Sequence, residues 1–300
     1  MPSRPRDDGL SEVVGFVLLL GLIVVALSLY QVYGVPAAGR EDEIAHMNAV
    51  KDRFVDYKIA LDSLWVNGRN GVLLSTAFEL GTGSAATGGR AFAFPILTPA
   101  GSGGTVSVKS GGANLTIAPE GKDPVTIPLG SLTYTSSNNY WVEQTWTYQG
   151  GAVFLSQEGG TTVRVGPSIA VAKSGTGNIN LDVALTRLEG SGISSGSGPV
   201  RVETRMRWSE SSSLSGTYHR VNLTVEADDE LTAGAWKRAF DDVRGRAKED
   251  YEIMLSEPVL SDDGKTVTFT VNPGTGKTIS LTMHQARYTV TIYNAASLAE

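Results

Sequence analysis

Residues 10–33 read LSEVVGFVLLLGLIVVALSLYQVY, and this stretch determines how the rest of the chain is arranged. No charged residue occurs in residues 13–33. A helix over that run rises about 1.5 Å per residue and reaches roughly 31 Å, close to the hydrocarbon thickness of a bilayer. The sequence therefore predicts a transmembrane helix over residues 10–35, with the lipid bilayer as its partner.

The composition describes the part of the chain beyond this helix. Glycine accounts for 35 of the 300 residues and charged residues for only 19%, which favours short strands joined by turns. The net charge of −6, without a cluster of Lys and Arg, argues against nucleic acid as a partner. The absence of cysteine excludes disulfides and thiolate chemistry.

The charges that flank the apolar run indicate its orientation. Arg4 and Arg6 precede the run, whereas residues 41–43 are all acidic and only Arg40 offsets them. Basic residues concentrate on the cytoplasmic side of membrane helices. We therefore expect a single-pass protein of the cell membrane, with residues 1–9 in the cytoplasm and the body outside the cell.

The order of the first segments is that of a known leader. A charged stretch, residues 1–8, is followed by Gly9 and then by SEVVG (residues 11–15) at the start of the apolar run. This resembles the N-terminus of archaeal type IV pilins and pilin-like proteins, which carry a class III signal peptide. The resemblance implies that a prepilin-type peptidase cuts between Gly9 and Leu10, so that the apolar helix remains on the mature chain. The alternative is a signal anchor that is never cut.

Three residues of the apolar segment bear on assembly. A carboxylate near the end of a spanning helix is costly unless it is paired or lies at the interface. Glu12 could pair with the new amine of Leu10 on a neighbouring pilin-like subunit, or it could lie among the headgroups beside the helix N-terminus. Gly15 and Gly21 would let helices approach closely, although their spacing is not GxxxG.

A second helix is predicted over residues 40–66, because its apolar residues recur at steps of three and four and form one stripe: Ile44, Met47, Val50, Phe54, Tyr57, Leu61 and Leu64. We expect this stalk helix to pack against the chain's own β-rich body; a coiled-coil seam is the alternative. Residues 34–36 (GVP) are expected to break the chain between the two helices, because proline removes a backbone donor.

Residues 70–300 are predicted to form a β-rich extracellular body. Apolar residues there alternate with polar ones at a period of two, which is typical of antiparallel sheets packed as a sandwich. One helix is expected over residues 231–251. The segment 190–199 (GSGISSGSGP) reads as a linker that divides two β-subdomains, or as one flexible loop. The fold class is α+β and mainly β.

No motif indicates an enzyme, a metal site or a cofactor. The three histidines lie far apart in the sequence and none has a metal-ligand spacing. Asn114 and Asn222 each begin an N-x-T glycosylation sequon and alternate with an apolar leucine, so we expect both to face solvent.

Two functions fit these features. The first is a pilin-like structural or adhesive subunit of the cell surface, and the size of the body favours a minor or pilus-associated subunit over a shaft subunit. The second is a membrane-anchored extracellular binding module that does not polymerise.

Overall fold

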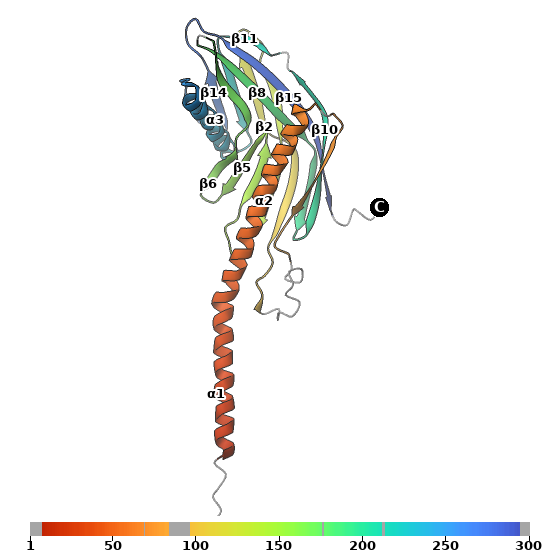
Figure 1. Cartoon of the computed structure of the whole chain (residues 1–300), viewed down its shortest axis with the longest axis vertical. Helices are drawn as coiled ribbons and strands as arrows, with labels where there is room; N and C mark the ends of the chain where they lie inside the picture. Colours follow the sequence, from red (N-terminus) through yellow and green to blue (C-terminus); the bar gives the residue numbers. More distant parts are fainter. Residues whose placement is uncertain (1–7, 69, 84–96, 176, 212–213, 295–300) are drawn as a thin grey trace, which may run out of the picture.

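The computed structural model describes residues 8–68, 70–83, 97–175, 177–211 and 214–294. It consists of one long N-terminal helix and a mainly β body with one further helix, as the sequence predicts (Figure 1). Residues 1–7 of the predicted leader and residues 295–300 of the predicted body lie outside the described residues.

The long helix runs from Asp8 to Val66 as α1 (Asp8–Leu29), a π-helical turn η1 (Tyr30–Gly34) and α2 (Val35–Val66). The predicted break at residues 34–36 is therefore wrong. In η1 the Val35 N–H donates to the Tyr30 carbonyl five residues earlier, and Pro36, which has no N–H to donate, follows this widened turn in the first turn of α2. Gly34 leaves room for the Tyr30 ring, which would lie 2.7 Å from a Cβ at that position.

The body is built from two sheets. The smaller sheet has the strand order β1-β10-β15-β8-β7, with β11 also paired to β15. Its strands are β1 (Leu73–Glu79), β7 (Ser168–Ser174), β8 (Asn178–Glu189), β10 (Pro199–Ser211), β11 (Gly216–Tyr218) and β15 (Ile279–Asn294). Every described pair in the body is antiparallel except β8 with β15, which is parallel and differs from the purely antiparallel prediction.

The larger sheet has the order β13-β14-β12-β2-β3-β4-β5-β6, with β9 also paired to β2. Its strands are β2 (Gly103–Pro119), β3 (Val125–Ser137), β4 (Thr145–Gln149), β5 (Ala152–Gln157), β6 (Gly160–Val165), β9 (Ser191–Gly196), β12 (Val221–Ala227), β13 (Val259–Leu260) and β14 (Thr266–Val271). Helix α3 (Glu230–Tyr251) packs on β6, β7, β12 and β14.

The prediction of a linker over residues 190–199 is wrong, because β9 lies within this segment and pairs with β2 along its whole length. Strands pair through backbone hydrogen bonds, which need no apolar side chains. The Ser/Gly composition of this segment therefore did not indicate a strand. Each sheet combines strands from both sides of this segment. A cut there would separate hydrogen-bonded neighbours in both sheets.

Two hydrophobic cores stabilise the body, and the long strands pass from one to the other. β3 places Ile127 and Leu129 in the core under α3, and Leu132 and Tyr134 in the core under α2. Between these pairs, the Leu188 carbonyl lies so close to Gly130 that a Cβ there would meet it at 2.0 Å. The boundary between the cores therefore crosses strands and does not divide the chain into consecutive halves.

Helix α2 packs on the body as expected from its apolar stripe, because Met47, Val50, Phe54, Tyr57 and Leu61 are all buried in the second core. They contact strands of both sheets, including β1 and β10 from one and β4 and β5 from the other. Figure 1 shows α2 lying along the body while α1 projects beyond it. The long helix therefore has one half that packs on the body, α2, and one exposed half that includes residues 13–33, which we call the bare half.

Candidate functional site: the projecting helix and its collar

The bare half of the helix exposes a long series of large apolar side chains. The large apolar side chains of residues 13–33 are 43–72% exposed. Soluble monomers rarely expose contiguous apolar patches of more than a few hundred Å². This helix is long and apolar enough to span a membrane.

The predicted assembly residues lie on this half, away from the described strands of the body. Glu12 is exposed, and a Cβ added at Gly15 or Gly21 would meet no atom within 4 Å. Gly21 follows Gly15 by six positions, which is not close to a whole number of helical turns, so the two glycines face different sides of the helix. The predicted cleavage point between Gly9 and Leu10 lies in the first turn of α1.

A loop of the body contacts the long helix at the point where the helix leaves the body. Glu43 of α2 is 1% exposed, and its carboxylate accepts three backbone hydrogen bonds. Oε1 accepts from the N–H of Asn139 at 2.6 Å, and Oε2 accepts from Tyr140 at 2.8 Å and Trp141 at 2.6 Å. We call residues 138–142 the collar. Three charge-assisted bonds from consecutive amides fix the collar to one turn of the helix.

The collar also packs closely against the helix. A Cβ at Gly39 would lie 2.4 Å from the Tyr140 ring and 2.9 Å from Pro99, so only glycine fits there without rearrangement. The Arg40 guanidinium lies 4.4 Å from the centroid of the Trp141 ring, within cation–π range. The helix therefore leaves the body in one defined direction.

Just above the collar, His46 Nε2 lies 3.1 Å from the Tyr134 hydroxyl, which itself donates to the Leu80 carbonyl at 2.8 Å. Because the Tyr134 proton is committed to Leu80, His46 Nε2 is the donor. Burial lowers the pKa of His46 below its usual 6.5, and this outweighs the opposing effects of a bond to Leu80 and of Glu43. Burial therefore disfavours the charged form of this imidazole in the fold.

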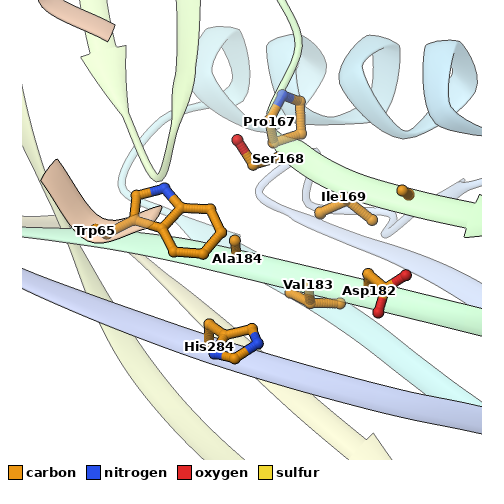
Figure 2. A pocket seen from close by; sticks show the side chains of 9 residues that line it. Trp65, Pro167, Ser168, Ile169, Asp182, Val183, Ala184 and His284 are labelled. Carbon is orange, nitrogen blue, oxygen red and sulfur yellow. The ribbon is translucent and has the colours of Figure 1, made fainter. Parts of the chain in front are cut away.

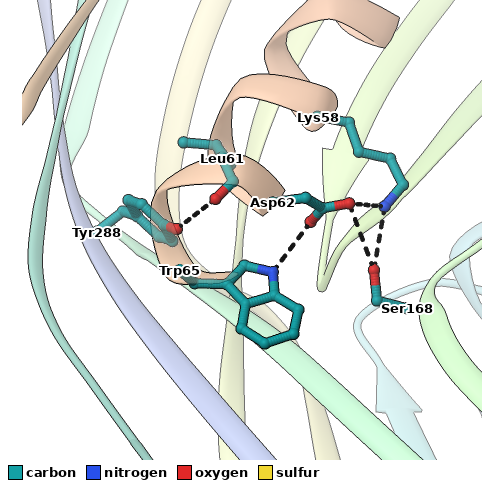
Figure 3. A network of polar contacts seen from close by, with 6 residues as sticks. All are labelled: Lys58, Leu61, Asp62, Trp65, Ser168 and Tyr288. Atoms are coloured by element: carbon teal, nitrogen blue, oxygen red, sulfur yellow. Dashed lines mark hydrogen bonds and ion pairs between the residues drawn. The ribbon is translucent and has the colours of Figure 1, made fainter. Parts of the chain in front are cut away.

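A polar network attaches the far end of α2 (Figure 3). The Lys58 ammonium, whose side chain is 8% exposed, pairs with Asp62 at 2.6 Å and donates to Ser168 Oγ of β7 at 3.2 Å. The Trp65 indole donates to Asp62 at 3.4 Å, and the Tyr288 hydroxyl donates to the Leu61 carbonyl at 2.7 Å. Both ends of α2 are thus tied to the sheets by polar contacts as well as by the core.

Beside this network is a cavity of about 260 Å³, lined mainly by apolar groups (Figure 2). The rings of Trp65 and His284 stack with centroids 5.8 Å apart, and Asp182 lies further along β8. Ser168, on the opposite side, is already hydrogen-bonded to Lys58, which is itself paired with Asp62. We therefore interpret these residues as a packing contact between α2 and the smaller sheet.

The two sequons lie on the same face of the larger sheet. Leu115 and Leu223 are fully buried, so Asn114 and Asn222 point away from the core. Asn114 is exposed, whereas Asn222 is partly buried and accepts a hydrogen bond from Thr270 at 3.0 Å. Glycosylation at both sites stays a prediction. Among the described residues, no three His, Cys, Asp or Glu side chains are grouped so as to hold a metal ion.

Sequence reasoning missed Gly39 and Glu43. One signal was available, because Glu43 lies four residues before Met47 and so continues the apolar stripe of α2 with a charged residue. A carboxylate on a buried stripe requires a partner. The collar that supplies it lies about a hundred residues later in the chain and carries no pattern that identifies it.

Comparison with known proteins gives one match. A family described as "Family of unknown function (DUF7289)" matches residues 100–289, which is most of the β body and none of the long helix. Neither the curated proteins nor the solved structures contain a match to the chain.

Proposed function

We propose that this chain, which belongs to the DUF7289 family, is a pilin-like cell-surface subunit with a structural or adhesive role. The observation that carries the proposal is the division of one continuous helix into an apolar half, which is exposed among the described residues, and a half fixed to a folded body. A subunit that assembles through its helices needs both. The bare half can pass from lipid into a bundle of similar helices, and the fixed half determines how the bodies are oriented.

In this proposal residues 1–9 lie in the cytoplasm and the body lies outside the cell. A prepilin-type peptidase removes the leader and leaves Leu10 as the first residue. Glu12 then lies beside the amine of Leu10 on an adjacent pilin-like subunit. The pair would offset the cost of a carboxylate inside a helix bundle of low dielectric constant. The size of the body suits a minor or pilus-associated subunit.

The mature N-terminus provides a first check. N-terminal sequencing or the intact mass of protein from the native membrane should give a chain that starts at Leu10. A chain that still starts at Met1 or Pro2 would indicate an uncut anchor, and a start near Ala38 would indicate ordinary signal-peptide removal.

The experiment that tests assembly is the substitution Glu12→Gln in the native host, with Glu41→Gln as the matched control. Glu41 is exposed on α2 and follows the apolar run. Its substitution therefore removes one negative charge outside the segment that would enter a helix bundle. We expect both variants in the membrane fraction, and only Glu12→Gln to be depleted from sheared, high-molecular-weight surface material. Equal recovery of both variants, or a wild-type chain that never enters such material, would favour the membrane-anchored binding module.

A further inference from the structure

A hollow of about 320 Å³ lies above the collar, between α2 and strands β4, β5 and β6. Its volume is at the lower end of ligand pockets, which span about 300–1,000 Å³, and suits one or two sugar rings. Asn48 and Lys51 border it from α2, and Trp141, Gln144, Trp146 and Arg164 border it from the body. The hollow is separate from the bare helix.

One partly exposed indole, that of Trp141, gives the hollow a fixed aromatic surface, and the buried Trp146 supports the wall of the hollow. Trp146 is 2% exposed, and its Nε1 donates to Gln144 Oε1 at 3.1 Å while its ring stacks on Phe54. Trp141 is held by its backbone bond to Glu43 and by the Arg40 guanidinium over its ring. Aromatic surfaces fixed in this way bind the C–H face of a pyranose without a further loss of side-chain entropy.

Two cations border the same hollow. The Arg164 guanidinium is exposed, lies 6.0 Å from the Trp146 ring centroid, and has no carboxylate partner within the part of the chain that the structure describes. Among the described residues, Lys51 pairs with its sequence neighbour Asp52 alone, at 3.3 Å, and both side chains are solvent-exposed. Such a pair is weak, so Lys51 remains available to a ligand.

From these contacts we infer that the hollow binds an acidic saccharide, with a sugar ring against the Trp141 indole and a carboxylate that pairs with Lys51 or Arg164 at its border. The exposed side-chain amide of Asn48 borders the same space and suits a sugar hydroxyl, whereas Gln144 is buried and its Oε1 already accepts from Trp146. With α1 in a bilayer, Lys51 lies about 27 Å along the helix from Tyr33. Lipid headgroups extend only about 5–8 Å beyond the hydrocarbon and do not reach this height.

The test uses the full chain in nanodiscs of zwitterionic lipid, with trigalacturonate as the probe and its fully methyl-esterified form as the neutral control. Calorimetry should show saturable binding of the acid and binding of the ester at least about ten-fold weaker, because the ester cannot form charge-assisted bonds. Equal affinity for both probes, or no saturable binding of the acid, would overturn the inference.

Two substitutions locate the site. Arg164→Gln, on an exposed rim side chain, should weaken binding of the acid by about five- to ten-fold. Arg205→Gln removes the same charge from an exposed position on β10 and should leave affinity unchanged. If the two variants weaken binding equally, the interaction is general electrostatic attraction and the inference fails. Neither outcome depends on assembly of the helix, so the proposed function is tested separately.

Discussion

Replacing Glu43 with glutamine tests whether the collar fixes the helix to the body. The carboxylate accepts three backbone bonds through two oxygens, at 2.6–2.8 Å. A glutamine has one acceptor oxygen, and its amide group presents hydrogens to whichever N–H faces it. If the oxygen serves Tyr140 and Trp141, the amide of Asn139 loses its acceptor, and the two bonds that remain are no longer charge-assisted.

The magnitude follows from these losses. A hydrogen bond to a charged group contributes about 1.5–3 kcal/mol, and a neutral one about 1 kcal/mol. One lost bond and two weakened bonds, offset by the smaller desolvation of a neutral side chain, give a local destabilisation of about 2–4 kcal/mol. Since about 1.4 kcal/mol is a factor of ten, opening of the collar should become roughly 30- to 1,000-fold more frequent.

Hydrogen exchange of the amides of residues 139–141 measures this opening directly. They should exchange faster by that factor in Glu43→Gln, while amides in the cores under α2 and α3 keep their protection. Glu41→Gln, two residues away and exposed, should leave the collar as it is in the wild type. If collar amides in Glu43→Gln exchange within about three-fold of the wild type, the account of the collar is incorrect.

Three further predictions concern the body. In urea unfolding, Gly39→Ala should destabilise the chain by about 1–3 kcal/mol, because its Cβ would overlap the Tyr140 ring. The control Gly245→Ala has open space around it and should stabilise the chain by up to about 1 kcal/mol. Equal effects of the two substitutions would contradict the packing described. Burial lowers the pKa of His46, so the unfolded chain binds more protons than the folded chain and stability should fall as the pH drops below 6.5. His46→Gln should reduce this fall, measured as the melting temperature against pH. A fall of the same size in the variant would refute a role for His46. Peptide mapping of native material should find more glycan on exposed Asn114 than on half-buried Asn222, and the reverse order would count against the exposure argument.

The features that could be predicted from the sequence have a regular period. The stripe at Met47, Val50, Phe54 and Tyr57 predicted which face of α2 is buried, because helix geometry repeats every 3.6 residues. Helix α3 was predicted over residues 231–251 and is observed over Glu230–Tyr251, where Asp229 caps it by accepting from the Thr232 N–H. Alternation of polar and apolar residues likewise predicted that the body is mainly β.

The features that could not be predicted depend on contacts with no period. β9 pairs through its backbone, so its Ser/Gly sequence resembled a linker. The parallel pairing of β8 with β15 joins segments about a hundred residues apart, and neither strand's own pattern specifies its partner. Pro36 suggested a break because its missing donor is normally costly, but a π-turn at Tyr30–Gly34 accommodates it. The collar is of the same kind, since a loop distant in sequence satisfies Glu43.

Cysteine scanning of the bare helix tests the central claim most directly, because the chain contains no cysteine of its own. Single cysteines are introduced at successive positions over residues 13–29, and intact cells of the native host are treated with a short bis-maleimide. If the helix packs among other pilin-like helices, a subset of positions that repeats every three to four residues should give cross-linked dimers and larger species in sheared surface material. A chain displayed on the surface that remains monomeric at every position would contradict assembly through this helix.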